Sequence, residues 1–229
     1  MTDAIDEHRG PRTGATLAQV ALRVGVSLNT VSRSLRAPHT VRPELKRRID
    51  AVMEEVGYVP NRVAGALAGT RSDLVGVVVT SLFHSEFAAV VEGLQAGLLE
   101  RDLQVMLGNT HYDPEQEWRI VRSMLSWRPA GVIIVGVDHH PRTAGLLAAS
   151  GVPVVEIWDA GGEAIDSTVG MNHDAIGRAQ ADHLLARSCR RLAFLGSLRP
   201  QDARARKRCQ GAAAVVAEAG LPPLAIRTA

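Results

Sequence analysis

The sequence predicts an all-α helix-turn-helix headpiece followed by an α/β body with a parallel sheet. Three observations predict it. Residues 16–57 show helical spacing with short breaks and no strand pattern. Beyond Arg71, short apolar runs alternate with amphipathic segments, as in strands covered by helices on both faces. The two parts also differ in charge, because residues 1–72 carry +4 and the rest −2.

Composition narrows the class of protein. The 229 residues are 46% hydrophobic, which is enough for a packed core, and no apolar run is long enough to cross a membrane. Residues 1–15 are polar, so they predict a disordered tail and not a secretory signal. Two cysteines cannot form a disulfide framework. We therefore expect a cytoplasmic protein. Its basic N-terminal part, residues 1–72, either binds a polyanion or is only a solvated basic surface.

The first forty residues of the ordered chain carry start and stop signals for three helices. Thr16 and Gln19 have the spacing of a capping box, and Gly25 ends the first helix. The second helix begins after Ser27 and extends to about Leu35. The third begins at Pro43 and ends at Gly57. Five apolar residues can close the core of the first two helices: Val20, Ala21, Val26, Val31 and Leu35.

The body alternates predicted strands and helices. The strands are Leu74–Val79, Leu103–Leu107, Gly131–Val135, Val152–Ile157, Thr168–Met171 and Arg191–Leu195. The helices are 85–100, 114–127, 141–150, 173–187 and 203–219. Ligands of such sheets bind beyond the carboxyl ends of the strands.

The second predicted helix has the residues of a DNA-reading helix. Leu28, Asn29 and Arg33 face outward near its N-terminal end, where Asn and Arg can make bidentate contacts with adenine and guanine. Three hydroxyl side chains are candidates for contacts with phosphates: Thr16, Thr30 and Ser32.

Residues 16–68 closely resemble the headpiece of the LacI family of bacterial repressors. The resemblance is carried by Val20–Ala21, Gly25–Ser27, Thr30–Arg33, Gly57–Arg62, Ala64 and Leu67–Ala68. Two positions depart from the family pattern. Gln19 stands where the family commonly has Asp. Arg42 replaces the usual Ser before the third helix and leaves that helix without a normal cap.

The resemblance makes residues 61–72 the family's hinge, which becomes helical only on operator DNA. Asn61 can cap a short helix, but two glycines weaken it, so it should not persist alone in water. The implied DNA-contacting residues here are Asn61, Arg62, Ala64 and Leu67. Leu67 matches the leucine that wedges into the minor groove, although it could instead be buried in a linker.

The resemblance continues through the body, which is similar to periplasmic sugar-binding proteins with two lobes around a small effector. It implies a first lobe at residues 73–165 and part of a second lobe at 166–229. Short strings such as Met124–Trp127 look like the gluconate-responsive members. The implied effector contacts are Thr80, Ser81, Phe83, Phe87, Trp158, Asp159 and Arg208. Arg208 suits a carboxylate, but it could also be a solvated charge, and Trp158 could be a core aromatic.

The family's body normally extends well beyond Ala229, so the resemblance implies an incomplete second lobe, weak effector binding and an uncertain dimer. The predicted function is a sequence-specific, repressor-type regulator of carbohydrate or sugar-acid utilisation. It would bind operator DNA as a homodimer, respond to a small sugar or sugar acid such as gluconate, and use no cofactor or membrane. The alternatives are a non-functional fragment and a sugar-binding module without regulation.

An enzyme on the same body is disfavoured. The sequence contains no Gly-x-Ser-x-Gly, His-Glu-x-x-His or glycine-rich phosphate loop. The contiguous Asp138, His139 and His140 could be taken for metal ligands, but a solvated loop is the favoured interpretation.

Overall fold

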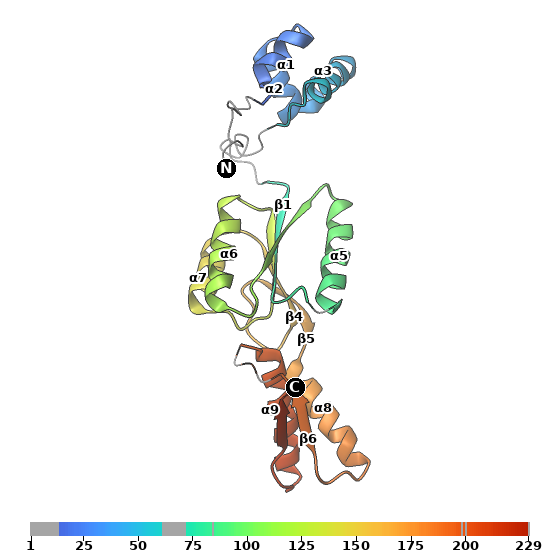
Figure 1. Cartoon of the computed structure of the whole chain (residues 1–229), viewed down its shortest axis with the longest axis vertical. Helices are drawn as coiled ribbons and strands as arrows, with labels where there is room; N and C mark the ends of the chain where they lie inside the picture. Colours follow the sequence, from blue (N-terminus) through green and yellow to red (C-terminus); the bar gives the residue numbers. More distant parts are fainter. Residues whose placement is uncertain (1–13, 61–71, 84, 198, 200, 229) are drawn as a thin grey trace, which may run out of the picture. The chain divides into compact units, whose positions relative to one another are not determined.

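A computed structural model describes residues 14–60, 72–83, 85–197, 199 and 201–228 (Figure 1). The chain divides into two compact units, a headpiece at Met1–Thr70 and a body at Arg71–Ala229. Within the described ranges, no helix is long and apolar enough to cross a membrane.

The headpiece consists of the helices α1 (Leu17–Val24), α2 (Leu28–Arg36) and α3 (Pro43–Val56), with a short 3₁₀ helix, η1 (Pro38–Thr40), between the last two. The capping box is present. The Thr16 hydroxyl accepts from the Gln19 N–H at 3.3 Å, and the Gln19 side chain accepts from the Thr16 N–H at 2.8 Å. Gly25 follows α1 with φ of 77°, a left-handed conformation that suits glycine and allows the sharp turn into α2.

The apolar stripes of the three helices meet in one core. Val20, Val31 and Ile49 are fully buried, one from each helix. Arg48 on α3 donates to the carbonyl of Val24 at 3.1 Å and so satisfies a free carbonyl at the end of α1. No side chain caps the N-terminus of α3 at Arg42, as the sequence predicts.

The body contains a five-stranded parallel sheet with strand order β2-β1-β3-β4-β5. The strands are β1 (Leu74–Val79), β2 (Gln104–Asn109), β3 (Gly131–Val135), β4 (Val154–Asp159) and β5 (Ser167–Met171). The helices that connect the first four are α5 (Ser85–Leu99), α6 (Pro114–Ser126) and α7 (Pro141–Ala149). Helices α6 and α7 cover one face of the sheet, and α5 covers the other (Figure 1).

Each face of this sheet has its own core. Val121 and Met124 of α6 and Leu147 of α7 pack on one face. Phe87 of α5 packs on the opposite face against the buried β1 side chains that point to that face, such as Val77. Because both faces are covered, β1 is apolar along its whole length rather than alternating.

A second, two-stranded parallel sheet pairs β6 (Ala193–Gly196) with β7 (Ala225–Thr228). It follows helix α8 (His173–Ala186) and contains helix α9 (Ala203–Glu218) in its connection. The two helices touch through their backbones at Gly211, where an added Cβ would lie 2.2 Å from the carbonyl oxygen of Asp174. This close approach fixes the position of α9, which supplies several residues of the candidate site.

The bounds of β2 and β6 are shifted by one or two residues from the sequence-based expectation, and three further details differ. The prediction lacks β7, whose four residues follow two prolines and gain their partner only in the fold. Strand β5 lies in the range expected for the second lobe, but it pairs with β4 at the edge of the five-stranded sheet. Strand β4 begins after Pro153, which has no N–H for the ladder, and not at Val152.

Candidate functional site

The first candidate site is the exposed face of α2 in the headpiece. Asn29 and Arg33 are exposed, and Leu28 is 49% exposed although it is a large apolar residue. Thr30 and Ser32 are half-buried, and the Thr30 hydroxyl lies 2.9 Å from that of the N-cap residue Ser27. Because the core residues of α2 point the other way, this face is free to meet a partner.

The remaining residues expected to contact DNA divide into two groups. Thr16 is exposed, and its hydroxyl is engaged in the capping box of α1. Asn61, Arg62, Ala64 and Leu67 lie outside the described residues, so their predicted roles stay predictions.

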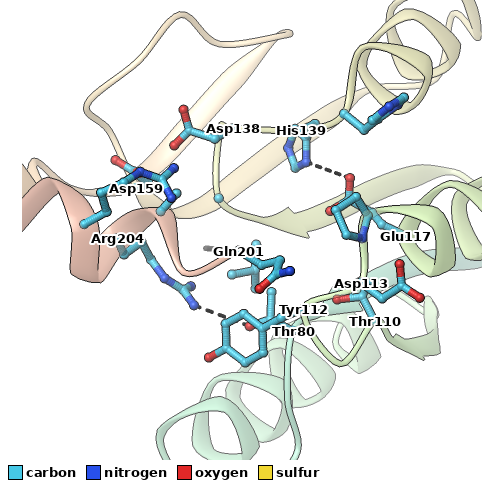
Figure 2. A pocket seen from close by; sticks show the side chains of 16 residues that line it. Thr80, Thr110, Tyr112, Asp113, Glu117, Asp138, His139, Asp159, Gln201 and Arg204 are labelled. Carbon is cyan, nitrogen blue, oxygen red and sulfur yellow. Dashed lines mark hydrogen bonds and ion pairs between the residues drawn. The ribbon is translucent and has the colours of Figure 1, made fainter. Parts of the chain in front are cut away.

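The second candidate site is a pair of adjoining cavities in the body, at the carboxyl ends of the parallel strands. The first cavity has a volume of about 320 Å³, and Figure 2 shows the side chains that line it. The second cavity has a volume of about 560 Å³. Tyr112 and Arg204 line both cavities. Strand ends and α9 together form the walls, as expected for an open parallel sheet.

The cavities collect most, but not all, of the residues expected to contact an effector. Thr80 and Asp159 line the first cavity, whereas Phe87, Trp158 and Arg208 line the second. Two expected residues line neither cavity. Ser81 accepts from the Phe83 N–H through its hydroxyl at 3.1 Å, and the side chain of Phe83 is 93% exposed.

Trp158 has an unusual backbone conformation for its size. Its φ is 75° near the end of β4, in the left-handed region that bulky residues rarely adopt. The indole ring stacks on Phe87 with 4.7 Å between centroids and 17° between planes. Strain of this kind is typical of functional sites, where the surrounding structure compensates for it.

Asp159 is fully buried, and its charge is neutralised by a residue that the sequence did not indicate. Lys207 on α9 bridges Asp159 at 2.7 Å and Asp138 at 2.6 Å. Burial lowers the pKa of Lys207, but its hydrogen bonds to the two carboxylates outweigh this effect and raise the pKa above 10.5. Lys207 is therefore charged and links α9 to the ends of β3 and β4.

Arg208 is oriented by a histidine. His173 Nε2 lies 2.7 Å from the carbonyl oxygen of Trp158, which can only accept, so this nitrogen carries the proton. The other ring nitrogen then accepts from Arg208 at 3.0 Å. Burial, followed by the positive charge of Arg208, lowers the pKa of His173 despite the hydrogen bond to Trp158. A neutral imidazole thus holds one end of the Arg208 guanidinium.

His139 corrects the expectation of a solvated loop. Its side chain is only 2% exposed, with Glu117 Oε1 3.1 Å from one ring nitrogen and Glu156 Oε1 3.2 Å from the other. Figure 2 shows His139 turned toward Glu117. The loop is buried here because α6 and β4 each bring a carboxylate to it from far along the chain. In contrast, Asp138 is exposed, and His140 caps α7.

Burial of His139 lowers its pKa, but the hydrogen bond and charge of Glu117 and the charge of Glu156 raise it more, so the pKa lies above 6.5. Nδ1 of the ring is hydrogen-bonded to Glu117, whereas Nε2 lies at ion-pair distance from Glu156 Oε1 and neither of these two atoms has a hydrogen-bond partner among the described residues. Within the described ranges, no group of three or more His, Cys, Asp or Glu residues is arranged to hold a metal ion.

Arg204 is the most buried arginine of the cavities, and no sequence motif indicated it as a site residue. Its Nη2 lies 3.4 Å from the Thr80 hydroxyl, and its side chain extends between α9 and the end of β1 (Figure 2). One signal could have found it, because Arg204 and Arg208 are four residues apart and share a helix face. The cavities thus combine cations, hydroxyls, carboxylates and aromatic rings, which suits a small polyhydroxylated ligand.

Comparison with known proteins follows the division into two units. Residues 16–61 match the family described as bacterial regulatory proteins, lacI family. Residues 72–228 match the periplasmic binding proteins and sugar binding domain of the LacI family.

Individual relatives agree with these matches. The chain is 36% identical over 210 residues to the HTH-type transcriptional regulator GntR of Escherichia coli (strain K12), covering 92% of this chain and 63% of that protein. It is 37% identical to the GntR regulator of Pseudomonas aeruginosa, covering 80% of this chain and 53% of that protein. The chain therefore spans less than two thirds of the length of these relatives.

Solved structures show the same architecture. A LacI-family transcriptional regulator from Silicibacter pomeroyi superposes with a TM-score of 0.87 at 41% identity, over 93% of this chain and 64% of that one. The lac repressor dimer bound to operator and the anti-inducer ONPF superposes with a TM-score of 0.74 at 26% identity, over 94% of this chain and 66% of that one.

Proposed function

Because the chain belongs to the LacI family of bacterial regulatory proteins, we propose that it is a sequence-specific, repressor-type regulator of transcription that responds to a small sugar or sugar acid. In this proposal the headpiece binds operator DNA as a dimer of two chains, the body binds the effector, and no reaction is catalysed. The observation that carries the proposal is that one chain contains both an exposed helix suited to base recognition and a body with a polar cavity.

The reading surface has the chemistry that base recognition needs. Asn29 and Arg33 are exposed on the same helix, within reach of base edges once the N-terminal half of α2 enters a major groove. Leu28 offers an apolar surface that can contact a thymine methyl group. The half-buried hydroxyls of Thr30 and Ser32 are suited to phosphates, which position the helix without specifying sequence.

The body supplies a second site whose occupancy can bias the first. Effector bound among Thr80, Trp158 and Arg208 would favour one arrangement of α9 relative to the strand ends. Such a bias reaches DNA only if the two arrangements of a dimer differ in affinity for operator. The proposed effectors are gluconate-like acids and neutral sugars, because the cavities offer both cations and hydroxyl partners.

Selection of genomic DNA fragments by the purified full chain tests the DNA-binding part of the proposal. We expect recovery of a roughly palindromic sequence. Arg33→Ala should then lose about 1–3 kcal/mol of binding free energy at one base pair in each half-site, with less effect when that pair is already changed. The matched control is Arg47→Ala, which removes one exposed positive charge from α3 instead.

The outcome separates the candidate functions. Equal weakening by Arg33→Ala on every sequence would assign Arg33 to the phosphates and not to the bases. Recovery of no preferred sequence, together with sugar binding by the same preparation, would favour the sugar-binding module without regulation. Failure to bind either partner would favour the non-functional fragment.

A further inference from the structure

Among the described residues, one buried positive charge has no carboxylate partner, and it lies where the two cavities of the body meet. Arg204 is only 9% exposed, and it lines both cavities. Its Nη1 is buried and has no hydrogen-bond partner among the described residues, and its Nη2 makes only a long contact of 3.4 Å with Thr80. A buried guanidinium in this state is costly, because it has lost water without gaining an anion.

Aromatic rings account for part of this arrangement. The guanidinium carbon of Arg204 lies 5.3 Å from the centroid of Phe87 and 5.6 Å from that of Trp158, and these two rings stack on each other. Cation–π contact offsets some of the lost hydration and holds the side chain in place. The rings cannot replace an acceptor for the N–H groups in the guanidinium plane, so the need for an acceptor remains.

Among the described residues, no carboxylate of either cavity forms an ion pair with Arg204, and most of these acids already have other partners. Lys207 pairs with Asp138 and Asp159, and His139 lies against Glu117. Asp202, near Arg204 in sequence, accepts from the Ala205 N–H as the cap of α9. Arg204 is therefore left to a ligand. By contrast, Arg208 already has one guanidinium nitrogen on His173.

From this geometry we infer that Arg204, and not Arg208, binds the carboxylate of a sugar acid at the junction of the two cavities. One carboxylate oxygen accepts from Nη1, and the hydroxyls of the sugar chain extend toward Thr80, Thr110 and Gln201 of the first cavity (Figure 2). A carboxylate carries the single negative charge that one uncompensated guanidinium needs, whereas a phosphate monoester brings nearly two. This inference rests on the proposed effector function of the body.

Titration calorimetry on the full chain tests the inference with D-gluconate, 2-keto-D-gluconate and D-galactonate as acids. D-glucitol is the neutral counterpart, and glucose 6-phosphate represents phosphate esters. We expect at least one acid to bind more tightly than glucitol. Arg204→Gln should weaken that acid by about 10- to 100-fold and leave glucitol nearly unchanged, because only the acid has a carboxylate to lose.

Two further variants separate charge from packing. Arg204→Lys keeps the charge and should recover part of the affinity for the acid. Arg190→Gln removes one exposed positive charge between α8 and β6, away from both cavities, and should leave every affinity unchanged. Circular dichroism and thermal unfolding establish that each variant is folded before its affinity is compared.

Several results would overturn the inference. These are equal weakening of acid and glucitol by Arg204→Gln, loss of acid preference in Arg208→Gln alone, Arg204-dependent preference for glucose 6-phosphate, and binding of none of the acids. The DNA selection described above is independent of all of them. A chain that selects operator but ignores Arg204→Gln would contradict only the carboxylate site. A chain that binds acid through Arg204 but selects no DNA would contradict only the regulatory function.

Discussion

The buried side chains of the headpiece are nearly all apolar, whereas those near the cavities of the body include several charged groups. In the described part of the headpiece, Ser34 is the only buried polar residue, and its hydroxyl donates to the carbonyl of Val31. The buried polar residues of the body include Glu156, Asp159 and Arg204. The headpiece thus depends on hydrophobic packing, and the body depends also on the pairing of buried charges.

This difference has a physical cause. In the proposed function the headpiece meets its ligand on an exposed face, so its core needs to do no more than hold three helices together. The body would meet its ligand inside a cavity, so it must keep polar groups away from water in positions where a ligand can contact them. Buried charges need partners, and the body supplies them in two places. Lys207 bridges Asp138 and Asp159, and His139 lies between Glu117 and Glu156.

Substitution of His139 by Gln should have the largest effect on stability, and it should act on the body alone. We expect a loss of about 3–5 kcal/mol in the free energy of unfolding, because removal of one partner leaves the buried Glu156 without its opposite charge. The folded-state pKa of His139 is raised. The charge-dependent part of the stabilisation by His139 is therefore fully present below pH 6.5 and is lost as the pH rises through the raised pKa.

Denaturant unfolding of the wild type and His139→Gln at several pH values between about 5 and 9 measures this effect. The control is His183→Gln, which changes an exposed histidine on α8. A stability difference that is the same at every pH would show that His139 acts by packing and not by charge.

Ile49→Ala should have the next largest effect, on the headpiece alone. Deleting this fully buried side chain should cost about 2–5 kcal/mol, with no dependence on the pH between about 5 and 9, because no Asp, Glu, His, Lys or Arg belongs to the hydrophobic cluster around it. Leu22→Ala, at an 83% exposed position on α1, is the control. Hydrogen exchange should show faster exchange in the headpiece only, and matching changes in the body would contradict the independence of the two cores.

Arg42→Ser should have the smallest effect and the opposite sign. It offers a hydroxyl to the uncapped N-terminus of α3, where helix capping contributes about 1 kcal/mol. The melting temperature of the headpiece should rise while that of the body stays constant. If the melting temperature falls, Arg42 makes a contribution to stability that outweighs the missing cap.

The same comparison explains how far sequence reasoning reaches. The headpiece was predictable to within a residue at most helix ends, because caps such as Thr16 and Ser27 are local signals. The strands β1 and β3 were also predicted with their observed bounds, since an apolar run between loops is a local pattern. In contrast, the environment of Arg204 joins residues 124 positions apart, and no short pattern records that distance.

His139 shows the limit most clearly. Its sequence neighbours are polar and suggest a solvated loop, and only the arrival of Glu117 from α6 and Glu156 from β4 buries the ring. Phe83 shows the reverse, because its place near β1 suggested a pocket residue and the structure exposes it. Both cases depend on tertiary neighbours, which spacing along the chain does not encode.

The core of the headpiece is formed by residues that are close in sequence, and this has a consequence for folding during synthesis on the ribosome. The core formed by its described residues lies between Leu17 and Tyr58, so it can fold soon after these residues emerge. Strand β1 pairs with the central strand β3, and β3 is not complete until Val135. The headpiece can therefore be finished while the body is still a nascent chain, and its apolar residues are already covered when the slower, less local sheet begins to assemble.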